Sequence, residues 1–187
     1  MARLKRDKET ILMKYLIISS GLRKQGNSWA MANLCCKRFQ ESGEDAELLA
    51  LSDHEMPYCD GKTYVDHPTT QLFRDKVGAV QGIILATPVY NFDANSAAKN
   101  FIEITGQVWE NKVVGFLCAA GGNRSYMSIM ALANSLMLDF RCVIIPRFVY
   151  ASGSAFSNGA VTDETVVDRI YELSDELVRF TTSLNSS

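Results

Sequence analysis

The 187-residue chain has no long apolar run, little excess charge and few cysteines. No apolar run approaches the roughly 18 residues of a membrane-spanning helix, so we expect no membrane partner. The formal net charge is −2 and no basic stripe is interleaved with aromatics, so nucleic acid is not an expected partner. The five cysteines are scattered and too few for a disulfide framework, which predicts a cytoplasmic protein.

Several familiar site motifs are also missing. The stretch "SSGLRKQGNSWAMA" fills three of the four fixed positions of the P-loop G-x-x-x-x-G-K-[ST], but Asn27 stands where lysine is required. No acidic residue ends the segment "ILATPVY", where magnesium would need one, which argues against triphosphate chemistry. Neither G-x-G-x-x-G nor the nucleophile elbow G-x-S-x-G occurs.

No metal site is expected in the loop between residues 53 and 68. His54, Cys59, Asp60 and His67 lie there, but their spacing matches no compact zinc motif. An iron–sulfur cubane needs about four thiolates, and this loop has one.

Alternation of two hydrophobic periods predicts the fold. Short Val- and Ile-rich runs indicate buried strands, and apolar residues at helical spacing separate them. The predicted strands are 12–19, 46–51, 82–87, 112–120 and 142–150, and the predicted helices are 26–40, 68–77, 97–108, 129–140 and 166–180. This alternation predicts an α/β flavodoxin-like sandwich: a five-stranded parallel sheet of order 2-1-3-4-5 with helices on both faces. We expect a polar extension over residues 1–12 and one domain over 13–187.

The loop after the first strand has the composition of a phosphate cradle. Gly21 and Gly26 let the backbone approach a ligand, and the following helix would present unpaired N–H groups. Arg23 and Lys24 add charge, while Asn27 and Ser28 add side-chain donors. The alternative is a plain glycine-rich turn with Asn27 or Ser28 as the helix cap.

Two more loops reach the same edge of the predicted sheet. "TPVYNFDANSAAKNFIE" combines a rigid turn, aromatic surface and amides, which suits a flat heteroaromatic ring. "AAGGNRSYMS" exposes the backbone N–H groups of Gly121 and Gly122, which could support negative charge. Arg124 follows, either as a solvated arginine or as the partner of a phosphate or of another chain.

Together these loops resemble the NAD(P)H-dependent FMN reductase family, near its iron–sulfur flavoprotein branch. "SGLRKQGNS" is similar to the family's phosphate loop, and "TPVYNFDANSAAKNFIE" to its second signature. The family usually has Gly-Ser where this chain has Ser20-Gly21, which would move one phosphate contact to a backbone amide. The resemblance covers about residues 14–150.

The resemblance implies FMN as cofactor, NADPH or NADH as co-substrate, a small-molecule acceptor, and a homodimer or homotetramer. It implies no catalytic side chain, because the flavin carries the redox chemistry. The candidate cofactor-binding residues are Ser20, Gly21, Arg23, Asn27, Ser28, Trp29, Pro88, Val89, Tyr90, Asn91, Phe92, Gly121, Gly122 and Arg124. Trp29 either borders the cofactor or packs.

Two rival functions remain open from the sequence. One is a flavodoxin-type electron carrier, although such carriers are usually more acidic than this chain. The other is a protein that binds a phosphate-bearing ligand other than flavin. The electron acceptor has no motif, and loops 53–68 and 151–161 are expected to select it.

Overall fold

Buried aliphatic strands form the centre of the molecule. The structure is a computed structural model that describes residues 13–185, so the predicted extension over residues 1–12 lies outside the described residues. The central strands are β1 (Lys14–Ser19), β2 (Asp45–Ala50), β3 (Gly82–Tyr90), β5 (Val113–Ala119), β6 (Val143–Ile144) and β7 (Val149–Ala151). The helices are α1 (Asn27–Glu41), α2 (Pro68–Gly78), α3 (Ser96–Thr105), α4 (Met130–Phe140) and α5 (Glu164–Asn185). Short β4 (Asp93–Ala94), β8 (Phe156–Ser157) and β9 (Ala160–Val161) lie in the loops.

The sheet has the predicted flavodoxin-like strand order. Its central path runs β2-β1-β3-β5, with β6 and then β7 along the outer side of β5. All these pairs are parallel, with Ile17 beside Ile84 and Ile84 beside Gly115. Because right-handed crossovers connect such strands, every strand-to-helix loop on this path emerges at the same edge.

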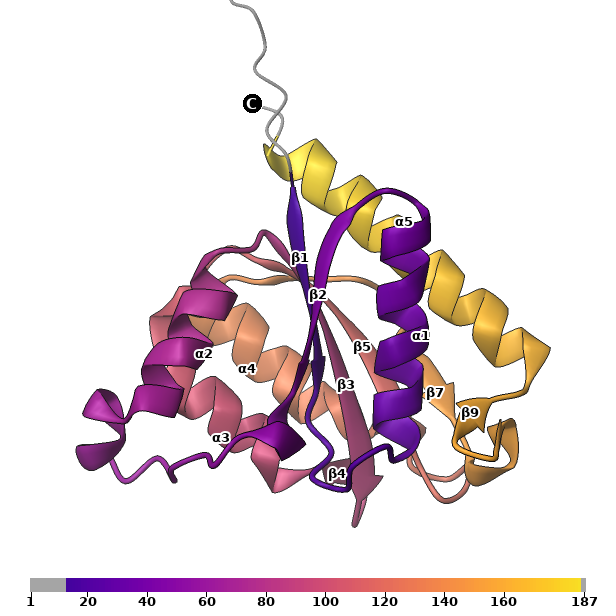
Figure 1. Cartoon of the computed structure of the whole chain (residues 1–187), viewed down its shortest axis with the longest axis horizontal. Coiled ribbons are helices and arrows are strands. Elements are labelled where there is room, and N and C mark those ends of the chain that lie inside the picture. The colour runs from indigo at the N-terminus through magenta and orange to yellow at the C-terminus, as the bar shows by residue number, and fades with distance from the viewer. Residues whose placement is uncertain (1–12, 186–187) are drawn as a thin grey trace, which may run out of the picture.

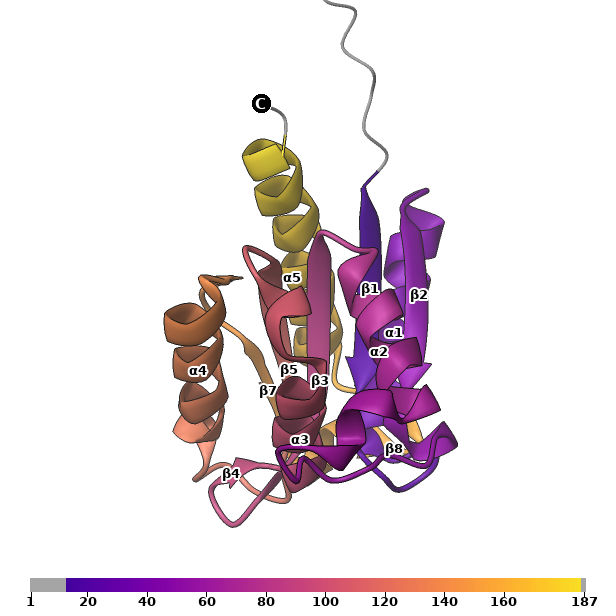
Figure 2. The ribbon, with the colours of Figure 1, turned by 90° about the vertical axis from the view of Figure 1, so that its left-hand side faces the viewer.

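Helices cover both faces of the sheet, as predicted. Helices α1 and α5 lie on one face, and α2, α3 and α4 lie on the other (Figures 1 and 2). Alternate residues of β1 serve the two layers, since Tyr15 and Ile17 pack with α1 and α5 whereas Leu16 and Ile18 pack on the opposite side. Buried aromatics such as Trp109 and Phe101 fill the second layer.

The predicted fifth strand, 142–150, is wrong in one respect, because it is interrupted. Ile144 pairs with Val114 and Val149 pairs with Leu117. Between these two pairs the outer strand advances by five residues, whereas β5 advances by three. The two extra residues form a bulge around Pro146 and Arg147. Proline has no N–H for the ladder, and Arg147 has a φ of 60°, so neither continues a regular strand.

The predicted helix 97–108 also ends early. Helix α3 stops at Thr105 because Gly106 adopts a φ of 62°, and a 3₁₀ turn follows over Gly106–Trp109. Within residues 13–185, no helix is both long and apolar enough to cross a membrane.

Candidate functional site

The three candidate loops meet at the carboxyl edge of the sheet, at the bottom of Figure 1. They enclose a cavity of about 200 Å³, which we name the loop cavity. Its lining includes the predicted residues Gly21, Arg23, Asn27, Ser28, Pro88, Val89, Tyr90 and Gly121. Ser20, Trp29, Asn91, Phe92, Gly122 and Arg124, also predicted, do not line it.

Helix α1 begins at this cavity without a side-chain cap. Its cap residue is Gly26, so the alternative in which Asn27 or Ser28 caps the helix is wrong. The first helical hydrogen bond runs from Ala30 N to Gly26 O, which leaves the N–H groups of the first turn without acceptors inside the helix. Helices α2, α3 and α5, in contrast, are capped by His67, Asn95 and Asp163. The start of α1 is therefore suited to an anion.

Gly21 is required by a close approach. A Cβ at this position would lie 2.4 Å from Ser28 Oγ and 3.6 Å from the Pro88 ring. The Ser28 side chain is buried against this glycine while still lining the cavity. Arg23 and Asn27 are exposed at the rim, where a guanidinium and an amide can add charge-assisted contacts to a bound anion.

Ser20 points away from the cavity, into the protein. Its hydroxyl donates to Asn95 Oδ1 (2.8 Å), and Asn95 Nδ2 donates back to the Ser20 carbonyl oxygen (2.7 Å). Thr87 Oγ1 reaches the same Asn95 oxygen at 3.1 Å, and the Ala98 N–H donates to it at 3.3 Å. Asn95 therefore caps α3 and joins two of the three loops. This role was not predicted from the sequence, although an asparagine directly before a helix is a recognisable cap.

A tight hairpin carries the predicted ring-contacting residues. Strand β3 continues to Tyr90 and pairs with β4, so Asn91 and Phe92 are the two loop residues. Both have positive φ, 52° and 65°, as a type I′ turn requires. Phenylalanine seldom adopts this conformation, and its ring is 67% exposed. Tyr90 borders the cavity, whereas Asn91 and Phe92 form the hairpin tip.

Aromatic side chains support the third loop. Gly121 lines the cavity, and a Cβ added at Gly121 or Gly122 would meet no atom within 4 Å, so both leave open space. The Tyr150 hydroxyl donates to the Gly122 carbonyl oxygen. Tyr126 stacks on Phe148, with 4.7 Å between ring centroids. Arg124 is exposed and Trp29 is half-buried.

Gly26, predicted as part of the phosphate cradle, also lines the cavity, and three further lining residues were missed: Ala119, Ala120 and Gly153. Gly153 comes from the loop after β7, where we had expected acceptor-selecting residues. A Cβ there would lie 3.5 Å from the Gly121 carbonyl oxygen. Only the pairing of β7 with β5 brings these segments together, so the local sequence carries no signal for the contact.

The other reactive side chains have structural roles. His67 Nδ1 accepts from Thr69 N at the start of α2, and the His54 ring packs edge-on against Phe73. Burial raises the pKa of the Cys35 and Cys118 thiols to about 12, so both stay protonated at neutral pH. Cys118 and Cys142 are buried, as expected from their apolar runs.

Comparison with known proteins identifies the class. Residues 13–157 match the family model of NADPH-dependent FMN reductases, and the chain belongs to this family. It is therefore an oxidoreductase that takes FMN as cofactor and NAD(P)H as co-substrate.

Named relatives agree with this class. The chain is 28% identical over 145 residues to an NAD(P)H-dependent FAD/FMN reductase of Geobacillus thermodenitrificans, covering 76% of this chain and 78% of the relative. It is 23% identical over 154 residues to an NADPH azoreductase of a Bacillus species, covering 81% and 84%. Among solved structures, a flavoenzyme NAD(P)H:acceptor oxidoreductase of Paracoccus denitrificans shares the fold, with a TM-score of 0.75 at 18% identity over 91% of this chain and 98% of that chain.

Replacing Asn95 with alanine tests the junction between the loops. The change removes the bonds to Ser20 and the cap of α3, so the free energy of unfolding should fall by about 2–4 kcal/mol in urea denaturation. Lys37→Ala, at an exposed position of α1, is the control and should be neutral. A loss below about 0.5 kcal/mol for Asn95→Ala would contradict the assigned role.

Proposed function

We propose that the loop cavity binds FMN with its phosphate at the start of α1. The observation that carries this proposal is the uncapped first turn of α1 opening into a cavity bordered by Arg23 and Ser28. The backbone N–H groups, the guanidinium and the hydroxyl are complementary to a phosphate, and a single phosphate needs neither the lysine nor the magnesium of a P-loop.

The remaining lining residues suit the flavin ring. Pro88, Val89 and Tyr90 form an apolar wall on one side, and Gly121 offers a backbone N–H on the other. We assign Asn91, Phe92 and Gly122 to the outer border of the ring and Ser20 to a backbone contact only. Trp29 and Arg124 do not line the cavity, and the exposed Arg124 remains available to a phosphate or a partner chain.

Hydride transfer needs one open face on the bound flavin. FMN supplies two-electron redox chemistry, accepting hydride from NADPH or NADH and reducing a small acceptor. The exposed Tyr90 and Phe92 rings offer a surface on which a flat nicotinamide, quinone or azo compound can stack. Relatives named as azo and quinone reductases support this range of acceptors.

A homodimer or homotetramer is the proposed assembly. Met127, Met130, Met137 and Leu138 are exposed on and just before α4, and a cavity of about 560 Å³ lies between α3 and α4. Apolar surface of this kind commonly marks a contact with another chain. We place the protein in a reducing cytoplasm, which the five unpaired cysteines support.

Arg23→Ala tests the phosphate contact. Loss of one charge-assisted hydrogen bond, about 2–3 kcal/mol, should weaken FMN binding about 30- to 150-fold in titrations of the apoprotein. Lys24→Ala, at the adjacent position, removes the same charge and serves as the control. Lys24 Nζ lies 3.8 Å from Asp53 Oδ1 and does not line the cavity, so the affinity of this variant for FMN should hardly change. Equal effects of the two variants would place the phosphate elsewhere.

Anaerobic stopped-flow mixing with NADPH or NADH tests the reductase function. Flavin absorbance should bleach in a single two-electron phase with at least one of the two nucleotides. An electron carrier would react slowly with both and take up electrons from dithionite in two one-electron steps. The carrier function would then replace the reductase function.

A variant of the hairpin extends the same experiment. Asn91→Asp keeps a residue that tolerates positive φ but removes the amide donor, so it should slow bleaching more than it weakens FMN binding. Asn158→Asp is the matched control, since Asn158 has a φ of 50° in the loop between β8 and β9. Identical bleaching rates in both variants would exclude a role for the Asn91 amide.

A further inference from the structure

The bulge in the outer strand creates a second, separate hollow. Between β6 and β7 the chain leaves the ladder after Ile145 N donates to Val114 O, and it rejoins at Val149. Arg147, in this excursion, holds a left-handed backbone conformation that an arginine seldom adopts. Such strain is commonly retained where a side chain is needed in one place.

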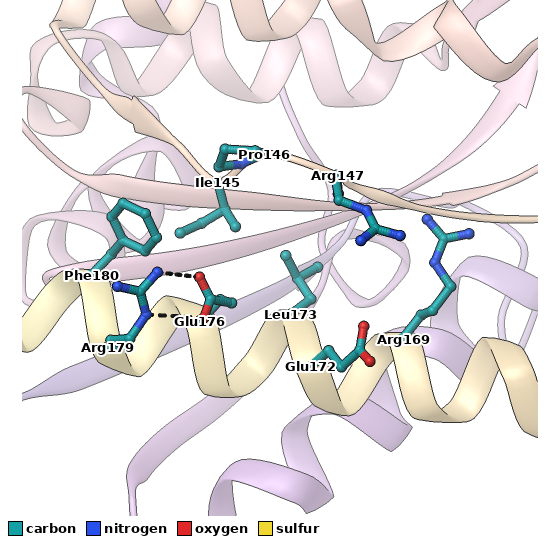
Figure 3. A pocket seen from close by; sticks show the side chains of 9 residues that line it. All are labelled: Ile145, Pro146, Arg147, Arg169, Glu172, Leu173, Glu176, Arg179 and Phe180. Carbon is teal, nitrogen blue, oxygen red and sulfur yellow. Dashed lines mark hydrogen bonds and ion pairs between the residues drawn. The ribbon is translucent and has the colours of Figure 1, made fainter.

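Helix α5 closes the hollow from the other side. A cavity of about 350 Å³ lies between the bulge and α5, and we name it the bulge cavity (Figure 3). Ile145, Leu173 and Phe180 give it an apolar floor. Leu173 comes close to the sheet because Gly115 has no side chain, and a Cβ there would lie 3.1 Å from Leu173 Cδ1. The bulge cavity shares no lining residue with the loop cavity.

Two arginines meet at one end of the bulge cavity. The guanidinium groups of Arg147 and Arg169 point toward each other in Figure 3. Arg169 Nη2 donates to the Phe148 carbonyl oxygen at 3.1 Å, which fixes it against the bulge. Among residues 13–185, neither arginine has a carboxylate within ion-pair distance. Two adjacent positive charges repel each other, and a bound anion would remove that cost.

The opposite end of the cavity is already neutral. Arg179 donates to both carboxylate oxygens of Glu176, through Nε at 2.9 Å and through Nη2. At the arginine end, Glu172 lies beside Arg169 in Figure 3; it is exposed at the rim and is the only unpaired carboxylate among the lining residues that the structure describes. The cavity thus has a cationic end, an apolar floor and a neutral far end.

We propose that the bulge cavity binds a small organic anion. Its acid group, a carboxylate, sulfonate or phosphate, pairs with Arg147 and Arg169, and its apolar body lies on Leu173, Ile145 and Phe180. Planar, bidentate recognition of such groups is the chemistry that guanidinium performs best. The site is distinct from the flavin site and does not depend on the function proposed for it.

Calorimetric titration with naphthalene-1-sulfonate tests this proposal. The full chain is first saturated with FMN, so that the loop cavity is filled. We expect one equivalent of the sulfonate to bind. The neutral naphthalene-1-sulfonamide, which lacks the anionic group, and inorganic sulfate, which lacks the apolar body, should each bind at least about 10-fold more weakly. Equal binding of the sulfonamide, or no binding of the sulfonate, would overturn the proposal.

Arg147→Gly separates binding from folding. Glycine adopts positive φ without strain, so this variant should keep or raise the melting temperature while weakening the sulfonate about 10- to 100-fold. Glu172→Gln removes the facing carboxylate and should tighten binding. Lys37→Gln, an exposed change on α1 with the same loss of charge as Arg147→Gly, is the control. Equal affinity of Arg147→Gly and Lys37→Gln for the sulfonate would show that Arg147 binds no anion and that the bulge only shapes the edge of the sheet.

Discussion

The pair of hydrogen bonds between Ser20 and Asn95 holds the site together. It ties the end of β1 to the start of α3, and thereby fixes the first loop against the second. Both side chains are buried, so the bonds are shielded from competing water and an unmatched partner would be costly. With these two loops joined, the Pro88 ring lies so near Gly21 that a Cβ added to the glycine would be 3.6 Å from it, and both residues line the loop cavity.

This junction allows the start of α1 to remain uncapped. A helix N-terminus without an acceptor carries a free-energy cost, which α2, α3 and α5 avoid with His67, Asn95 and Asp163. In α1 the cap position is glycine. The Ser28 hydroxyl occupies the space that a Cβ at Gly21 would need, and Ser28 lines the cavity. In the proposed FMN complex the phosphate would supply the missing acceptors, and the free-energy cost of the uncapped helix would then be relieved on binding.

The sequence predicts the layers well because they depend on burial. The buried positions of strands β3 and β5 are almost all apolar, and the helices that connect the strands show one apolar face. That the first loop lines the cavity was also predictable, since its glycines, arginine and serine lie close together in the sequence. Asn95 could have been predicted as a helix cap from its place before α3, but its inward orientation depends on Ser20, which is 75 positions away.

Other features depend on contacts that no local pattern encodes. The bulge at Pro146 and Arg147 sits inside a run that reads as one strand, and only the register against β5 shows the two extra residues. Gly153 reaches the loop cavity because β7 ends beside β5. The turn at Asn91 and Phe92 was predicted as ring surface rather than as a hairpin, because the two-residue strand β4 is too short to have a period.

Comparing FMN with riboflavin tests the central claim most directly. The two ligands share the ring and the ribityl chain and differ only in the phosphate. Because the account places the phosphate on the first turn of α1 beside Arg23, the apoprotein should bind FMN at least about 100-fold more tightly than riboflavin in equilibrium fluorescence titrations at fixed ionic strength. Equal affinities would contradict it, since the uncapped helix would then have no part in holding the cofactor.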